Sequence, residues 1–177
     1  MANQVVNSIE IKKINRNRIY KLLYTENDGL TKQQIAQKLN ISQPTVLQNL
    51  KELQSKGLVK EDGSAASIGG RRPILFSCNL TARYAVGIDI TKHHLAIVII
   101  ELGANIIANS RVQLTFENTD EYFYSVGNLV RQTLNVYFIP KEHVLGVGIS
   151  VLGLLSEDFR RVEYAPILSF TGGTIEA

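Results

Sequence analysis

The chain has 177 residues, of which 45% are apolar and 20% charged, a balance typical of a soluble globular protein with one ordinary domain or two small ones. Its longest apolar run, residues 95–100, is far too short for a membrane span, and its first residues lack the basic region and apolar core of a signal peptide. We therefore expect a cytoplasmic protein with no membrane partner. One cysteine, Cys78, and three histidines, His93, His94 and His143, offer no Cys-x-x-Cys pair, so we expect no structural metal and no redox chemistry. We also expect no cofactor.

Charge is divided unevenly along the chain. Residues 1–83 hold 13 Lys and Arg against 6 Asp and Glu, whereas residues 84–177 hold 6 against 10. A basic segment suits a polyanion, but solvated lysine faces are common. The charge therefore indicates nucleic acid only if it coincides with an element that can enter a groove.

A basic amphipathic helix is predicted over residues 9–23. Its apolar residues recur at roughly helical spacing; they are Ile11, Ile14, Ile19, Leu22 and Leu23. Thr31 and Gln34 form a capping-box pattern for a second helix that ends near Leu39. Ser42 is a good N-cap for a third helix, which runs to about Lys56.

The second and third helices are predicted to pack as a helix-turn-helix. Ile35, Leu39 and Ile41 form one apolar set, Val46, Leu50 and Leu53 form another, and the small Ala36 lets the helices approach closely. The outward face of the third helix would carry side chains that can read base edges, namely Gln43, Thr45, Gln48, Asn49 and Glu52. The alternative is an ordinary helical packing with a solvated face, which Lys and Glu would suit better than Gln, Asn and Thr.

A basic hairpin, or wing, is predicted next. Two short strand-like segments, residues 58–62 and 74–78, flank a Gly/Ser-rich loop. The run Gly69-Gly70-Arg71-Arg72-Pro73 could lay its arginines along phosphates or into a minor groove, although a hairpin loop with incidental arginines is also consistent with it. Cys78 is expected to be a small core residue.

These elements, in this order, resemble the DNA-binding domain of ROK-family repressors. The resemblance covers residues 11–80 and includes Lys13-Ile14-Asn15-Arg16-Asn17-Arg18-Ile19, both helices of the pair, Gly57-Leu58-Val59 and the Gly-Gly-Arg-Arg-Pro wing. It implies an α+β winged-helix domain over residues 1–82. A partial, actin-like or sugar-kinase-like α/β domain would follow over residues 83–177. Gln43 stands where the family often has a basic residue, which leaves the operator sequence open.

The second half predicts the order β-β-β-α-β. The predicted strands are residues 84–90, 95–101, 106–116 and 144–151. In the third of these strands, Val112, Leu114 and Phe116 alternate toward one face. The helix begins at Asn118-Thr119-Asp120, and its expected buried stripe is Tyr122, Val126, Leu129, Val130 and Tyr137. This order, with the run at 147–153, resembles the ROK sugar-kinase fold.

Catalysis is not expected. ROK kinases carry an Asp-x-Gly-x-Thr type of phosphate loop, whereas residues 89–94 keep Asp89 but lack the glycines. Asp89 is either a vestigial phosphate-loop residue or a strand-end residue that closes a turn, and His93 and His94 are expected at the surface or in a turn. The later sugar-binding, catalytic and zinc-binding motifs of the family have no counterpart, and the charges around Glu157, Asp158 and Glu163 are expected to be solvated.

We therefore expect a transcriptional regulator, a repressor of sugar-utilisation genes, that binds double-stranded DNA as a homodimer. A sugar effector is expected only in a complete chain. The expected DNA contacts are Arg16, Thr31, Ser42, Gln43, Thr45, Gln48, Asn49, Lys51, Arg71 and Arg72. Two alternatives stay open: a sugar kinase with an N-terminal extension, which the missing glycines and catalytic carboxylate disfavour, and a protein-interaction module.

Overall fold

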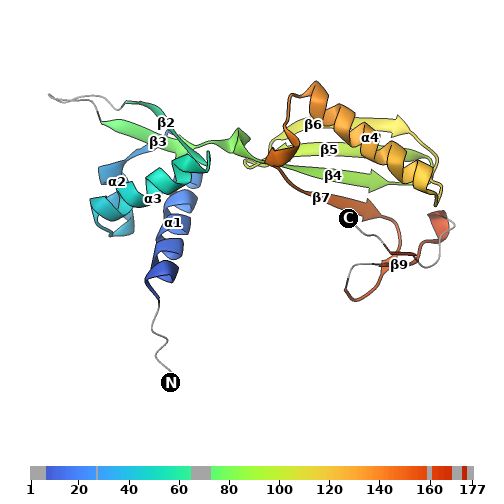
Figure 1. Ribbon diagram of the computed structural model, residues 1–177, viewed down its shortest axis with the longest axis horizontal. Coiled ribbons are helices and arrows are strands. Elements are labelled where there is room, and N and C mark those ends of the chain that lie inside the picture. The colour runs from blue at the N-terminus through green and yellow to red at the C-terminus, as the bar shows by residue number, and fades with distance from the viewer. Residues whose placement is uncertain (1–6, 27, 65–72, 159–160, 169–172, 175–177) are drawn as a thin grey trace, which may run out of the picture. The chain divides into compact units, whose positions relative to one another are not determined.

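The computed structural model describes residues 7–26, 28–64, 73–158, 161–168 and 173–174. The chain divides into two compact units, Met1–Leu80 and Thr81–Ala177 (Figure 1). Within the described ranges, no helix combines the length and apolarity needed to cross a bilayer.

The first unit is a winged helix-turn-helix, as the sequence predicted. Its helices are α1 (Ser8–Thr25), α2 (Lys32–Leu39) and α3 (Gln43–Ser55). Its strands are β1 (Leu30–Thr31), β2 (Val59–Ser64) and β3 (Ile74–Cys78), which form an antiparallel sheet in the order β1-β3-β2. The sequence did not predict β1, whose two residues pair with Leu75 and Phe76 of β3.

Local capping signals determine where the paired helices begin and end. The Thr31 hydroxyl accepts a hydrogen bond from the Gln34 amide at 3.3 Å, and the Gln34 side chain accepts one from the Thr31 amide at 2.8 Å. Asn40 ends α2 in the left-handed region, with φ 52°. The Ser42 hydroxyl then accepts from the Thr45 amide and begins α3, so the predicted capping box and N-cap are confirmed.

One apolar core joins the three helices to the sheet. Its buried members are Ile19, Leu23, Leu30, Ile35, Val46, Leu50, Leu53, Val59, Phe76 and Cys78. The predicted contact between the two apolar sets of the helix pair is confirmed, since Leu39 and Ile41 pack against this core. Burial raises the pKa of the Cys78 thiol to about 11, in keeping with its expected role as a core residue.

The predicted apolar stripe of α1 is only partly correct. Ile19 and Leu23 are buried, but Ile11 and Ile14 are 48% and 47% exposed. The N-terminal turns of α1, dark blue in Figure 1, extend beyond α2 and α3. Ile14 also lies about 140° around the helix axis from Ile19, away from the buried face.

The second unit is a mixed sheet with one long helix on it. The strands β4 (Tyr84–Ile90), β5 (His94–Glu101), β6 (Ile106–Gln113) and β7 (Val144–Val151) lie in the order β6-β5-β4-β7, with β7 parallel to β4 and the other pairs antiparallel. The helix α4 (Asp120–Val136) lies between β6 and β7 in the chain. The order β-β-β-α-β is therefore confirmed.

Short elements join or follow this sheet. Single 3₁₀ turns occur at Leu80–Ala82, Lys141–His143 and Pro166–Leu168. The strands β8 (Leu154–Leu155), β9 (Arg161–Tyr164) and β10 (Gly173–Thr174) pair in the order β10-β9-β8. This small antiparallel sheet contains the charged segment around Glu157, Asp158 and Glu163, and these three side chains are exposed, as expected.

The helix α4 packs on one face of the main sheet (Figure 1). Thr119 is its N-cap, and Tyr122 and Val126 are buried among Val86, Ile88 and other strand residues. The predicted stripe was wrong at Tyr137, which is 45% exposed, because α4 ends at Val136 and Leu134 fills the core instead.

The end of β6 differs slightly from the prediction. The strand β6 ends at Gln113 rather than at Phe116, although the amides of Leu114 and Phe116 still donate to the carbonyl groups of His93 and Lys92. The side chains of Val112, Leu114 and Phe116 all pack against the core of the second unit, as their alternation predicted.

Gly29 precedes β1 with a φ of +70°, and a Cβ there would lie 3.0 Å from the carbonyl oxygen of Phe76. We expect Gly29→Ala to lower the free energy of unfolding by about 2–4 kcal/mol, because it adds a backbone clash to the strain of a left-handed alanine. Thermal and urea unfolding of the full chain would measure it. Gly57→Ala is the matched control, since Gly57 has the same φ but open space around it; we expect a loss of about 1–2 kcal/mol there. Equal losses would show that the contact with Phe76 is irrelevant.

Candidate nucleic-acid interface

The outward face of α3 presents polar side chains with no internal role. Gln43, Gln48 and Lys51 are exposed, and within the described chain their side chains form no hydrogen bond or ion pair. The opposite face of the helix is fixed by burial of Val46 and Leu50. The exposed amides and the ammonium group are therefore available to a ligand, and they are the residue types that bind base edges and phosphates.

Two other expected contact residues, Thr31 and Ser42, are helix N-caps, and a third, Thr45, is bonded to one of them. The hydroxyl groups of Thr31 and Ser42 accept the capping bonds of α2 and α3, and the hydroxyl of Thr45 lies 2.8 Å from that of Ser42. These side chains are engaged at the N-termini of the two helices, where the positive end of each helix dipole also favours an anion.

Asn49 does not lie on the outward face, so this part of the prediction was wrong. Its side chain is 2% exposed, and its amide group donates a hydrogen bond to the Thr45 carbonyl oxygen at 2.8 Å. The reason is the helical period: Asn49 follows Val46 by three residues and precedes Leu53 by four, which places it on the buried face.

Arg16 and Glu52 link α1 to α3. The Arg16 guanidinium forms an ion pair with the Glu52 carboxylate, which also binds the Lys56 ammonium group at 3.2 Å. Arg18 donates to the Leu39 carbonyl oxygen at 3.0 Å. Arg16, an expected DNA contact, is therefore held by an internal partner, and Glu52, expected among the outward-facing residues, is half-buried in that pair.

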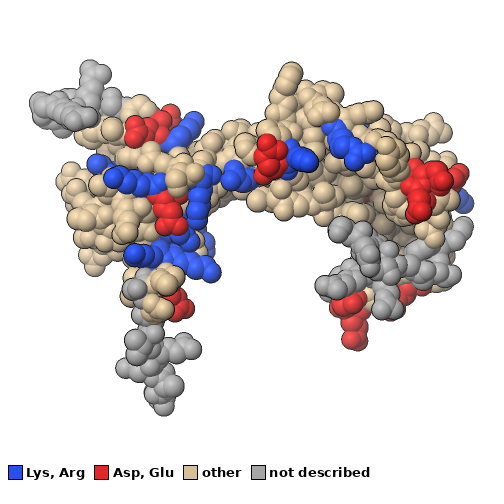
Figure 2. All heavy atoms as spheres, in the orientation of Figure 1, with Lys and Arg blue, Asp and Glu red and all other residues tan. Residues whose placement is uncertain are grey.

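Other basic side chains on α1 are exposed. They are Lys12, Lys13 and Lys21, and Figure 2 shows blue side chains gathered along this helix. They add positive potential to the unit that carries α3. Arg71 and Arg72, the arginines of the predicted wing, lie outside the described residues.

Leu47 is a surface residue of α3 that was not among the expected contact residues. It is 38% exposed, whereas Val46, Leu50 and Leu53 are buried. The signal was present in the sequence, because Leu47 falls outside the helical period of those three residues.

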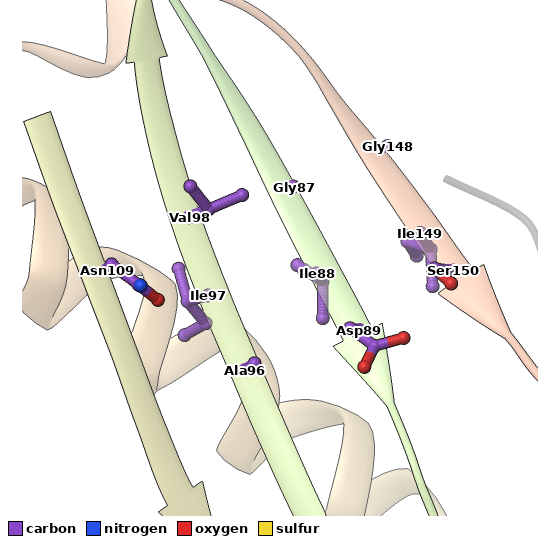
Figure 3. A pocket seen from close by; sticks show the side chains of 10 residues that line it. All are labelled: Gly87, Ile88, Asp89, Ala96, Ile97, Val98, Asn109, Gly148, Ile149 and Ser150. Carbon is purple, nitrogen blue, oxygen red and sulfur yellow. The ribbon is translucent and has the colours of Figure 1, made fainter. Parts of the chain in front are cut away.

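The second unit contains a shallow hollow of about 340 Å³ on the sheet face that is turned away from α4 (Figure 3). Gly87 and Gly148 lie side by side in β4 and β7, and Asp89 and Ser150 follow them at the strand ends. The hollow exists because the two glycines carry no side chains. Asp89, the expected vestigial phosphate-loop residue, lines this hollow.

The turn after Asp89 is closed by its own hydrogen bonds. The Thr91 amide and hydroxyl donate to the His94 carbonyl oxygen at 3.0 and 2.9 Å, and the Thr91 hydroxyl accepts from the His94 amide at 3.1 Å. Lys92 and His93 are exposed in this turn, as expected for His93. Among the described residues, no three His, Cys, Asp or Glu side chains are grouped so as to hold a metal ion.

Comparison with known proteins supports the assignment of the first unit. Residues 13–60 match a family model described as winged helix-turn-helix DNA-binding. The chain is 23% identical over 175 residues to the DNA-binding transcriptional dual regulator NagC of Escherichia coli K12, an alignment that covers 98% of this chain and 43% of that protein. It is 26% identical over 148 residues to the xylose repressor of Staphylococcus xylosus, covering 81% of this chain and 37% of that protein.

A solved structure supports the fold of both units. It is a ROK-family transcriptional regulator described as a homologue of the E. coli MLC protein, with a TM-score of 0.64 and 18% sequence identity, and the match covers 92% of this chain and 41% of that one. The fold expected from the sequence, a winged helix followed by an α/β sheet, is therefore confirmed. The chain spans less than half the length of these regulators.

We expect Asn49→Asp to lower the free energy of unfolding by about 2–4 kcal/mol at neutral pH, because a buried carboxylate would face the Thr45 carbonyl oxygen without a proton to donate. The loss should shrink as the pH falls, since a protonated carboxyl group can donate again. Urea unfolding of the full chain at several pH values would measure both effects. Gln48→Glu makes the same chemical change on the exposed face and should cost under about 0.5 kcal/mol; equal losses would contradict the assigned orientation of α3.

Proposed function

We propose that the chain, on the premise of its similarity to ROK-family regulators, represses transcription of sugar-utilisation genes by binding operator DNA through α3. The proposal rests on one observation above all. The side chains of Gln43, Gln48 and Lys51 are exposed and form no hydrogen bond or ion pair with any other described residue. The opposite side of the same helix is held by the core.

We assign different tasks to these side chains. Gln48 and Gln43 carry amides that can pair with an adenine edge in the major groove, which gives sequence preference. Lys51 and the exposed lysines of α1 would bind phosphates, which gives affinity without sequence preference. The hydroxyl groups of Thr31 and Ser42 lie at helix N-termini, where the positive end of the helix dipole favours a phosphate.

The sequence of the wing adds two further DNA contacts to this proposal. Arg71 and Arg72 follow two glycines and precede Pro73. We propose that both arginines contact the phosphates or the minor groove beside the site of α3.

For the second unit we propose a sensing and pairing role rather than phosphoryl transfer. The turn that follows Asp89 holds Lys92 and His93 in place of glycines and is closed by hydrogen bonds between Thr91 and His94. In this turn the amides of Thr91 and His94 are already bonded, and the side chains of Lys92 and His93 stand where glycines would let a triphosphate approach closely, which disfavours the sugar-kinase alternative. A sugar effector would require the remaining part of a protein of full family length.

We also propose that the chain pairs with a second copy through the sheet of the second unit. Leu145, Val147 and Ile149 on the edge strand β7 are 66%, 46% and 40% exposed. An apolar sheet edge of this kind rarely stays in water. A two-fold pair would also place two recognition helices on one DNA duplex, which multiplies specificity.

We expect the full chain to bind duplex DNA with an affinity that falls with salt by about 0.9 logarithmic units per phosphate contact for each tenfold rise in salt. Lys51→Ala should weaken all sequences about equally and reduce that slope by about one unit. Gln48→Ala should leave the slope unchanged and cost about 1–3 kcal/mol at one base pair. Fluorescence anisotropy on selected and random duplexes would measure these effects. An equal loss on selected and random DNA for Gln48→Ala would show that α3 is not the reader.

Sedimentation velocity at micromolar concentration tests the pairing. We expect a dimer, and we expect Val147→Lys to give a monomer because a charge on the edge strand disfavours pairing. Lys141→Glu, an exposed change just before β7, is the control and should leave the dimer intact. A folded wild-type monomer with no tendency to associate would contradict the proposal.

A further inference from the structure

Leu47 is the one large aliphatic residue of α3 that the core does not use. The helix contains Val46, Leu47, Leu50 and Leu53; three of these are at most 2% exposed, whereas Leu47 is 38% exposed. A single exposed leucine is common on protein surfaces and is not a site by itself. The position of Leu47 on α3, among the side chains assigned to DNA, is what supports a role in binding.

Leu47 lies in the middle of the polar face assigned to DNA. Successive helical residues are rotated by about 100°, so Gln43 lies one turn before Leu47 and Lys51 one turn after it, on the same side of the helix. Gln48 is its neighbour in the chain and is also exposed. An apolar side chain is thus bordered by the two amides and the ammonium group that carry the proposed function.

The chemistry of the major groove provides one apolar partner for such a side chain. Among the base edges exposed there, donors and acceptors predominate, and only thymine presents a methyl group. A branched aliphatic side chain gains nothing from a donor or acceptor, but it gains hydrophobic contact from a methyl group. Leucine between two glutamines would therefore favour a thymine next to the base pair that an amide reads.

We propose that Leu47 packs against the 5-methyl group of a thymine in the major groove and is a specificity-determining residue of this regulator. The inference rests on the proposed function, because it requires α3 to enter that groove. It goes further by naming a residue and the chemical group that it recognises.

The test uses the full chain and a duplex selected by that chain from a random-sequence pool. The selected duplex is synthesised again with uracil in place of thymine, one position at a time, so that each variant lacks a single methyl group. We expect one or two positions at which the wild-type affinity falls about three- to fivefold, the effect of one buried methyl group. Leu47→Ala should bind the thymine and uracil duplexes equally at those positions.

Two further variants separate specific contact from general damage. Leu47→Met keeps an apolar side chain and should keep the uracil effect, since methionine can still reach the methyl group. Gln43→Ala changes the neighbouring exposed residue and should lower overall affinity while also keeping the uracil effect. Because Leu47 is partly exposed, the Ala variant should unfold at nearly the wild-type temperature.

The outcomes are distinguishable. A wild-type chain that binds every uracil variant as tightly as the thymine duplex overturns the inference, and so does an unchanged uracil effect in Leu47→Ala. If the selection enriches no sequence at all, the proposed function itself fails, and the inference fails with it.

Discussion

The burial of one face of α3 is the constraint on which the first unit depends. Val46 and Leu50 are fully buried and Leu53 is nearly so, and each contributes about 1.5–3 kcal/mol by leaving water. Turning the helix by one residue about its axis would expose at least one of them and bury a polar neighbour. The orientation of Gln48 and Lys51 is therefore a consequence of the core, which holds the exposed face in place without any bond from that face itself.

Signals that act over a few residues could be predicted from the sequence. The capping box at Thr31 and the N-cap at Ser42 depend on side chains and amides only three positions apart, so the helix starts agree with the prediction. The order of the strands along the second unit was also predictable, because their apolar runs are bounded by turns. The exposure of Leu47 could also have been predicted from the sequence, because its angle around the axis of α3 differs from that of the buried residues.

Other features were missed because the type of a residue was given more weight than its position, or because an element was too short to form a pattern. The amide of Asn49 suggested a base-reading role, yet its position on the helix buries it and leaves it to bond Thr45. Ile14 was counted in the apolar stripe of α1 although it lies about 140° around the helix from the buried Ile19, and Ile11 is half-exposed near the N-terminus of that helix. Tyr137 was placed one turn too far along α4, and the strand β1 is too short for any alternation to reveal it.

The parallel pairing of β4 with β7 also has a consequence for the order of assembly. The hairpins β4–β5 and β5–β6 join neighbours in the chain through short turns, so their ends meet at small entropic cost. The strand β7 reaches β4 only after α4 has intervened, and contacts between distant segments form slowly. We expect the meander to form first and β7 to dock last, so that nascent chains expose the bare edge of β4 during synthesis.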